Sequence, residues 1–447
     1  MSDRITSLRR NLSQSLGFVP GVIVFVFAVL GIVLVEIDRQ LDLDGVKVVF
    51  EGDGGAARTV LSVIAGSLIT VAGLTFSITM VVLQLASSQF SPRILRTFFG
   101  DRITQITIGT YVGTFVYAIL VLRAVGSFGD AGFVPRLSVT VASLLGIGAV
   151  ILLVVFLHHV SLLIQVSHVV GNVAHDTLAR IDVLHPEPLG RSVEDREEDE
   201  LLASWRAEAP GRVLPHRPGF VQRIGLHDLT SGLSGRADRL AILVCPGDFV
   251  SVETPIAEVW PAAAAERCGE AIAGAISIAD ERDLDQDVGF GIQQLTDTAL
   301  KGISPGINDP ATAVTCIGYL QAILVRLAGR AAPSGVRRFP DRGVTVIVRS
   351  RGFEEHLESL VQVARYVDAD AWVAGKILRA LEACAAAAAE VGSEERLAAV
   401  LAVAGPIAGQ AVEDAKSDRD LAALTRALAA VEEAARRPGR EPRPPAS

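Results

Sequence analysis

The sequence contains little lysine, few aromatic residues and few cysteines. Aromatic residues make up 5% of the 447 positions. Lysine occurs only at Lys47, Lys301, Lys376 and Lys416, so arginine supplies nearly all of the positive charge. We attribute this bias to coding composition and not to function. The formal net charge is −9, which argues against nucleic acid as the main partner because phosphates require a basic protein surface.

Cysteine spacing excludes a disulfide framework. The four cysteines, Cys245, Cys268, Cys316 and Cys384, are far apart, form no CxxC motif and lie in the C-terminal half. They predict reduced, buried thiols in a cytoplasmic domain.

Motifs of catalysis are also absent. The sequence has no nucleophile elbow, no glycine-rich phosphate loop, no HExxH or similar metal-ligand spacing, and no paired carboxylates inside an apolar segment. We therefore expect no enzyme activity, no cofactor and no metal. An enzyme that acts on lipid or on the cell envelope remains an alternative.

Long apolar runs dominate the N-terminal part, in a chain that is 50% hydrophobic with a mean hydropathy of +0.42. Four segments reach the length of about 20 apolar residues that crosses a bilayer. They cover residues 16–37, 59–86, 103–122 and 134–157. The first is too long and begins too late for a signal peptide. The fold class predicted is a transmembrane domain of four helices at 16–165, preceded by a cytoplasmic N-terminus at 1–15.

Charge around these segments predicts their orientation. Arginines precede the first span (Arg4, Arg9, Arg10) and follow the second (Arg93, Arg96, Arg102), whereas the connection between them is acidic (Asp38, Asp42, Asp44, Glu51, Asp53). Because positive loops stay in the cytoplasm, both termini are expected there.

Polar residues in the second span follow a regular stripe. They step by three and four residues through Gly66, Thr70, Gly73, Ser77, Met80, Gln84, Ser87 and Ser91. The third span has a similar stripe of Thr104, Thr107, Tyr111 and Thr114, and Gly109 and Gly113 form a GxxxG on another of its faces. Two interpretations stay open: small residues allow close helix packing, or the stripes line a wet pore in an oligomer.

The fourth span is expected to continue beyond Leu157 as one amphipathic helix. Its polar face carries His158, Ser161, Gln165, His168, Asn172 and His175 at steps of three and four. This face is either simply solvated or forms rings in a symmetric oligomer, as a cytoplasmic vestibule that binds ions or senses pH.

The C-terminal half is predicted to be a cytoplasmic mixed α/β region. Residues 166–211 are expected to form a helical extension and a charged linker, and 212–262 a small β subdomain. In this segment, "PGDFV…PIAEV" resembles the hammerhead of lipoyl and biotinyl domains. Because residues 212–260 contain no lysine to carry a cofactor, the likeness is only to the shape of a small β-barrel. An α/β domain at 263–436 follows, with a strand at 343–350 and helices at 353–367, 370–391, 394–413 and 418–436. A disordered tail is expected at 437–447.

The loop "GISPGINDPAT" has two interpretations. Asp309 followed by Pro310 is a helix N-cap with proline at the first helical position. Alternatively, Asn308 and Asp309 join Asp285 and Asp287 around a cation.

Two long stretches, "GLTFSITMVVLQLASSQFSPRILRTF" and "DQDVGFGIQQLTDTALKGISPGINDPATA", resemble the bacterial integral-membrane family catalogued as domain of unknown function 2254. The resemblance covers about residues 15–390 and implies a four-span region in a bacterial inner membrane followed by a soluble region, without an activity. We expect an oligomeric channel or permeation pathway with a cytoplasmic gating domain. The alternative is a membrane-anchored scaffold or sensor that binds a ligand or protein. Expected partners are the lipid bilayer, further copies of the chain, and a small ion or cytoplasmic protein.

Overall fold

The computed structural model describes residues 17–40, 50–89, 101–126, 133–163, 165–185, 194–233, 235, 237–330, 335–367 and 370–437. The chain divides into two compact units, Met1–Val169 (unit 1) and Val170–Ser447 (unit 2), and the division falls within helix α7 (Val166–Leu184). The predicted N-terminal segment 1–15 and, apart from its first residue, the predicted tail 437–447 lie outside the described residues.

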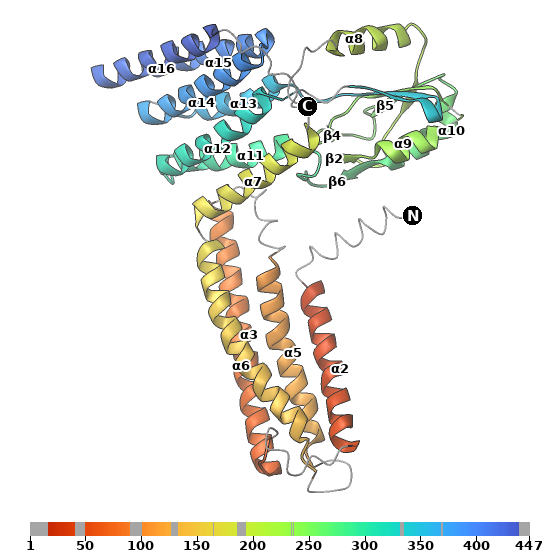
Figure 1. Ribbon diagram of the computed structural model, residues 1–447, viewed down its shortest axis with the longest axis vertical. Helices are drawn as coiled ribbons and strands as arrows, with labels where there is room; N and C mark the ends of the chain where they lie inside the picture. The colour runs from red at the N-terminus through yellow and green to blue at the C-terminus, as the bar shows by residue number, and fades with distance from the viewer. Residues whose placement is uncertain are drawn as a thin grey trace, which may run out of the picture. The chain divides into compact units, whose positions relative to one another are not determined.

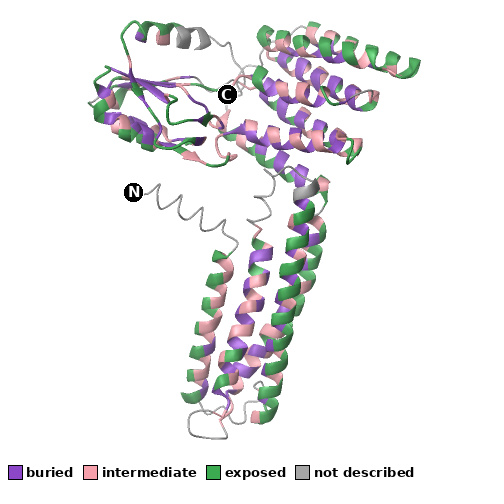
Figure 2. Cartoon of the chain, turned by 180° about the vertical axis from the view of Figure 1, so that it is seen from behind, coloured by how far each residue is buried: buried purple, intermediate pink, exposed green. Residues whose placement is uncertain are grey.

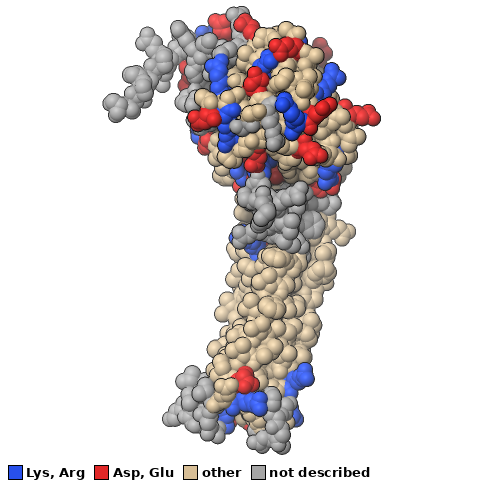
Figure 3. Space-filling model, turned by 90° about the vertical axis from the view of Figure 1, so that its right-hand side faces the viewer, with Lys and Arg blue, Asp and Glu red and all other residues tan. Residues whose placement is uncertain are grey.

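Unit 1 contains, in its described part, four long helices and the first turn of α7 (Figure 1). The four are α2 (Phe18–Gln40), α3 (Gly54–Gln89), α5 (Arg102–Ala124) and α6 (Arg136–Leu163). They coincide with the four predicted spans, and each is long and apolar enough to cross a bilayer. Figure 3 shows their surface, which carries no Lys, Arg, Asp or Glu across the middle of the visible face.

Two helices of unit 2 also meet the length and composition of a membrane helix. They are α12 (Pro310–Ala328) and α15 (Glu394–Glu413), so the described residues contain six candidate membrane helices where the sequence predicted four. Both pack against other helices of unit 2, α12 against α11 (Val288–Ile303) and α15 against α14 (Ala371–Glu390). A helix buried in a core is as apolar as a membrane span, so apolar length alone does not separate the two.

Helix α5 is the most buried of the four in unit 1 (Figure 2). Its Gly109 and Gly113 allow α2 to approach closely, as the GxxxG spacing predicted. A Cβ on Gly109 would lie 2.9 Å from Pro20 Cα, and one on Gly113 would lie 3.0 Å from the ring of Phe27. On other faces α5 packs against α3 and α6.

The prediction of one continuous helix beyond Leu157 is wrong. Helix α6 ends at Leu163 and α7 begins at Val166. The backbone N–H of Gln165 donates to Leu162 O, three residues back, and Gln165 O accepts from Val169 N to start the next helix. Neither proline nor glycine marks this interruption in the sequence.

The described part of unit 2 contains two open sheets. The five-stranded sheet has the order β1 (Gly211–Val213), β5 (Ala257–Trp260), β3 (Arg239–Ile242), β8 (Val344–Val348), β7 (Val336–Phe339). Its pairings are antiparallel except for β3 with β8. The three-stranded sheet has the order β4 (Phe249–Val250), β2 (Gly219–Ile224), β6 (Ile276–Ala279) and is antiparallel.

The predicted β-barrel is therefore wrong. Consecutive strands of the 212–262 segment enter different sheets, and both sheets add strands from outside it, so this segment cannot close on itself. Helices α9 (Leu226–Leu233) and α10 (Ala264–Ala275) contribute to one apolar core with both sheets.

The remaining elements of unit 2 are mainly helical. They are α8 (Glu194–Trp205), α11, α12, the 3₁₀ turn η1 (Pro340–Arg342), α13 (Phe353–Ala364), α14, α15 and α16 (Asp418–Arg436). The four helices predicted after residue 350 are confirmed with boundary shifts of up to three residues, as is the strand at 343–350. All four cysteines are free and buried, as predicted.

Candidate functional site

A buried carboxylate organises the start of α11. Asp287 is the N-cap of this helix and accepts from Phe290 N at 3.1 Å, which satisfies an otherwise unpaired backbone donor. It is only 3% exposed, and Arg282 donates to both of its oxygens, at 2.8 and 3.0 Å. Arg282 also lies 5.4 Å from the centre of the Phe290 ring. The fork of hydrogen bonds compensates the burial of the carboxylate.

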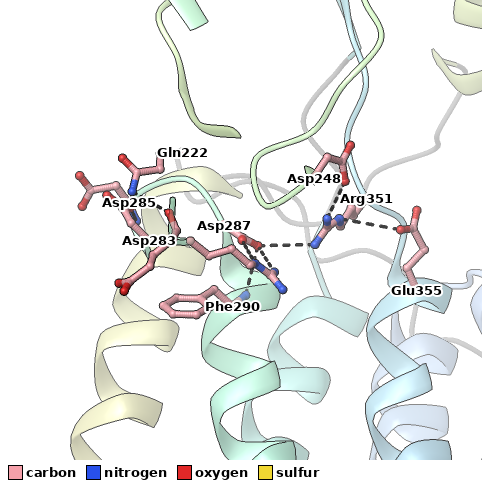
Figure 4. Close-up of polar contacts among 10 residues, drawn as sticks. Gln222, Asp248, Asp283, Asp285, Asp287, Phe290, Arg351 and Glu355 are labelled. Atoms are coloured by element: carbon pink, nitrogen blue, oxygen red, sulfur yellow. Dashed lines mark hydrogen bonds and ion pairs between the residues drawn. The ribbon is translucent and has the colours of Figure 1, made fainter. Parts of the chain in front are cut away.

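A second arginine joins this carboxylate to another (Figure 4). Arg351 donates to Asp248 at 2.7 Å, and its other terminal nitrogen lies 3.6 Å from Asp287 Oδ1. Burial opposes the charge of Arg351, but its hydrogen bond to Asp248 and the charge of Asp287 outweigh the effect of burial, so the pKa of Arg351 lies above its usual value. Arginines and aspartates thus alternate in a network that holds three loops together.

The turn between β3 and β4 fits closely against this network. Asp248 accepts from the backbone N–H of Cys245 at 2.8 Å, which closes the turn. Gly247 has φ +91°, and a Cβ there would overlap the carboxylate of Asp287. Only glycine combines this conformation with this approach.

These loops enclose a cavity of about 230 Å³ within unit 2. It is lined by Leu184, His185, Ile224, Leu226, Cys245, Pro246, Gln286, Asp287, Val288, Gly289, Arg337, Val348, Arg349, Ser350, Arg351 and His356. Apolar side chains thus form much of the wall, with a few polar groups among them, as in small-molecule sites.

The cysteine and the buried histidine of the wall are uncharged at neutral pH. Burial, reinforced by the charges of Arg351, His185 and Arg282, lowers the pKa of His356 to about 4. Burial, reinforced by the charge of Asp248, raises the pKa of Cys245 to about 11. The Cys245 thiol is therefore a poor nucleophile.

Two arginines at the cavity have no carboxylate partner among the described residues. Arg337 lies in β7 and Arg349 directly follows β8, and both side chains are exposed. Three arginines and one aspartate line the cavity, which leaves a formal charge of +2 with histidine neutral. The arrangement suits a small anion, because Arg351 is already engaged whereas Arg337 and Arg349 remain available.

The stripe predicted on the second span lies on the outer face of α3. Thr70, Ser77 and Gln84 are exposed on unit 1. Thr70 and Ser77 donate to the carbonyls of Gly66 and Gly73 within the same helix, at 2.8 and 3.0 Å. Only the backbone of Ser87 is described, and Ser91 lies outside the described residues.

The predicted stripe on the third span faces the opposite way, into unit 1. Thr107 and Thr114 are both fully buried. The structure therefore does not bring the two stripes of one chain together.

The polar face predicted on the fourth span remains exposed. His158, Gln165, His168, Asn172 and His175 are all exposed, and no contact between them is found in the described part of the chain.

The loop before α12 contains the predicted cap. Asp309 accepts from Thr312 N at 3.1 Å and from the Thr312 hydroxyl at 2.6 Å, and Pro310 occupies the first helical turn. These hydrogen bonds hold the pKa of Asp309 below its usual value. Asn308 has the left-handed φ of +49° that asparagine tolerates.

The cation site proposed for this loop is not formed. Asp285 pairs with Arg180 at 2.9 Å and Asp287 with Arg282. Among the residues that the structure describes, no group of three or more His, Cys, Asp or Glu side chains could hold a metal.

Sequence reasoning missed most of the cavity. Arg337, Arg349 and His356 belong to segments that carry no motif, and Cys245 was recognised only as a buried thiol. The one available signal was the run "DQDVGFG", whose Gln286 and Asp287 both line the cavity.

In a comparison with known proteins, residues 13–383 match a family described as predicted membrane protein (DUF2254), which confirms the resemblance of the two motifs. The chain is similar to the "Uncharacterized protein MT1328" of Mycobacterium tuberculosis (strain CDC 1551 / Oshkosh), with 31% identity across 94% of this chain and 80% of that protein. The "Uncharacterized protein Mb1321c" of Mycobacterium bovis is 32% identical over the same shares. No solved structure matches the chain.

Proposed function

The chain belongs to the family of predicted membrane proteins DUF2254, and on that premise we propose that it is a membrane-anchored sensor whose unit 2 binds a small anion. The observation that carries the proposal is the charge of the cavity wall. The ion pairs of Asp287 and Asp248 with Arg282 and Arg351 lie at the cavity. Two further arginines of the wall, Arg337 and Arg349, have no carboxylate partner in the described part of the chain. The volume of about 230 Å³ is below the common range for drug-sized ligands, so the ligand has few atoms. A phosphate or carboxylate on a short apolar body fits this wall.

Helix α7 connects the cavity to helix α6 along the chain. Leu184 ends α7 and lines the cavity with His185. At its other end, α7 begins three residues after α6 ends. A ligand that shifts Leu184 therefore acts on the segment that directly follows α6.

Within unit 2, ion pairs connect α7 to neighbouring elements. Arg180 pairs with Asp285 at 2.9 Å, in the loop before α11. Asp182 accepts from Arg326 at 2.6 Å and from Arg330 at 3.0 Å, at the end of α12. The pair with Asp285 links α7 to the loop whose Gln286 and Asp287 line the cavity.

The test measures thermal unfolding of the full chain in detergent with inorganic phosphate, glycerol 3-phosphate or succinate at constant ionic strength. A ligand at 100 times its Kd stabilises the folded state by about 2.7 kcal/mol. We expect a saturable rise in the unfolding temperature with at least one probe, and a Kd at least tenfold weaker in Arg337→Gln and Arg349→Gln. Comparing the probes separates a phosphate site from a carboxylate site.

Arg338→Gln is the matched control, because Arg338 neighbours Arg337 in β7 but does not line the cavity. The proposal fails if none of the three anions gives a saturable rise, or if Arg338→Gln weakens binding as much as the two cavity variants.

A second function, permeation between copies of the chain, is supported by the position of the polar stripe. Thr70, Ser77 and Gln84 lie on the surface of α3, where they would line a path only if several copies surround it. Cysteines at 70 and 77 should then react with water-soluble thiol reagents in membranes. Cysteines at Leu74 and Val81, which are 56% and 54% exposed on apolar positions of α3, should not. Equal, negligible labelling at all four positions would eliminate this path.

We also propose a location and topology: a bacterial inner membrane crossed by α2, α3, α5 and α6 only, with both termini in the cytoplasm and no enzyme activity. The capped start of α12 at Asp309 and the ion pair of Arg326 support its placement outside the bilayer. Reporter fusions after residues 45 and 130 should read outside, and fusions after 97, 180 and 350 inside. An outside signal at 350 would mean that α12 crosses the membrane.

A further inference from the structure

The inward face of α5 carries a hydroxyl at every turn. The residues Thr104, Thr107, Tyr111, Thr114 and Tyr117 succeed one another at steps of three or four positions. Thr104 is 5% exposed, and the other four are fully buried. A purely apolar seam would pack equally well in a membrane, so this line of hydroxyls requires another explanation.

Three hydroxyls on helices α3 and α5 lack a hydrogen-bond partner among the described residues. They belong to Thr107 and Tyr111 on α5 and to Thr75 on α3. All three side chains are fully buried. Other hydroxyls of these helices, those of Thr79 and Thr114, donate to the carbonyl four residues back. A buried hydroxyl without a partner is costly, and a bridging water molecule would offset that cost.

The three hydroxyls fall within about one helical turn of each other in unit 1. Tyr117 packs with Leu61 in one apolar cluster and Tyr111 packs with Leu68 and Ala72 in another, so α3 and α5 run antiparallel. Thr75 lies about one turn after Ala72 on α3, and Thr107 lies one turn before Tyr111 on α5, so Thr75 and Thr107 are at the same level.

The distance between successive hydroxyls along α5 is suited to a bridging water molecule. A step of three or four residues along an α-helix advances about 4.5–6 Å. Two consecutive O–H···O hydrogen bonds of about 2.8 Å cover that distance, with one water molecule between the hydroxyls. Buried waters in proteins occupy such polar sites and make two to four hydrogen bonds each.

Ionisable groups lie at both ends of the line. At one end, Asp101 caps α5, accepts from Thr104 N and faces His159 Nε2 at 2.8 Å. The side chains of Asp101 and His159 are 13% and 19% exposed, so solvent reaches them. At the other end, Tyr117 donates to Ser138 O at 2.9 Å.

The Ser138 end is also anchored by a carboxylate. The hydroxyl of Ser138 donates to Asp38 at 2.6 Å, and Asp38 also accepts from Leu137 N and Ser138 N, at 2.9 and 2.8 Å. Asp38 is 8% exposed. The line of polar groups therefore runs from a carboxylate at the start of α5 to a carboxylate at the end of α2.

We propose that water molecules bridge these hydroxyls and that protons cross unit 1 along the buried face of α5. In each step, a hydroxyl or water accepts a proton on one side and releases another on the opposite side, so no group is consumed. The path lies within one chain, unlike a path between copies, and does not depend on ligand binding by unit 2.

The test uses the full chain in liposomes that contain a trapped pH-sensitive dye, with a potassium gradient and valinomycin as the driving force. We expect proton flux well above that of protein-free liposomes. Thr107→Val and Tyr111→Phe, which change little but the hydroxyl, should lower it at least tenfold. Thr107→Ser retains a hydroxyl and should preserve the flux. Circular dichroism and size exclusion verify that each variant is folded.

Thr59→Val and Ser143→Ala are the matched controls, because they belong to neither proposed path. Thr59 is exposed on α3, Ser143 lies in a groove between α3 and α6, and each hydroxyl donates to the carbonyl four residues back in its own helix. They should leave the flux unchanged. Flux no greater than in protein-free liposomes overturns the inference. Flux that survives both Thr107→Val and Tyr111→Phe overturns it as well, and so does flux that only the control variants abolish.

Discussion

Neutralising the buried carboxylate of Asp287 should destabilise unit 2. The substitution Asp287→Asn retains a good helix N-cap, so it isolates the loss of charge from the loss of the cap. Breaking a buried ion pair costs about 3–5 kcal/mol. The partners Arg282 and Arg351 are 15% and 23% exposed, so water compensates part of this cost. We therefore expect a loss of about 2–4 kcal/mol, which corresponds to roughly 5–10 °C for a unit of this size.

Intrinsic fluorescence reports selectively on this change, because all three tryptophans, Trp205, Trp260 and Trp372, lie in unit 2. Asp287→Ala should cost about 1 kcal/mol more than Asp287→Asn, since alanine also removes the cap. The control Asp341→Asn changes an exposed carboxylate of the 3₁₀ turn and should be silent. A drop below 2 °C for Asp287→Asn would refute the view that the network stabilises the cavity.

Three further changes have distinct signatures. The pKa of His356 falls from 6.5 to about 4 on folding, so the unfolded state binds more protons between these values and stability falls as pH drops from 6.5 to 4. His356→Leu should remove up to roughly 3 kcal/mol of this pH dependence, measured as unfolding temperature against pH. Asp309→Ser should be nearly silent, whereas Asp309→Ala should lose about 1 kcal/mol, and equal damage by both in a folded protein would indicate a bound partner. Gly109→Ala should separate α2 from α5, because its Cβ would lie 2.9 Å from Pro20 Cα, and cysteine cross-linking between the two helices should then weaken.

Local features were predictable because they depend on neighbours in the chain. Apolar length identified the four helices of unit 1, and the GxxxG of Gly109 and Gly113 indicated the close approach of another helix. Asp309 followed by Pro310 specified a helix start, since a cap requires only groups three residues away. The same local reasoning counted four membrane helices where the described residues contain six candidates, because a helix packed in a core can have the composition of a membrane span.

Features that depend on distant segments were not predictable. The motif "PGDFV" suggested a small barrel, but β3 pairs in parallel with β8, about a hundred residues later, so the sheet includes strands from outside the 212–262 segment. The cavity likewise combines Cys245, Asp287 and Arg349 from separate loops, and the two carboxylates beside it, Asp248 and Asp287, both lie against Arg351.

The direction in which each polar stripe faces also depends on tertiary packing. Periodicity alone places Thr70 with Ser77 on one face of α3, and Thr107 with Tyr111 on one face of α5. It does not say whether a face meets lipid, another copy or the interior of unit 1. Helix α5 packs against α2, α3 and α6, so its hydroxyls are buried, whereas α3 turns Thr75 inward and leaves Thr70 and Ser77 outside. The sequence thus determined which residues share a face, and the packing of the helices determined what each face contacts, because burial is a property of neighbours that periodicity does not contain.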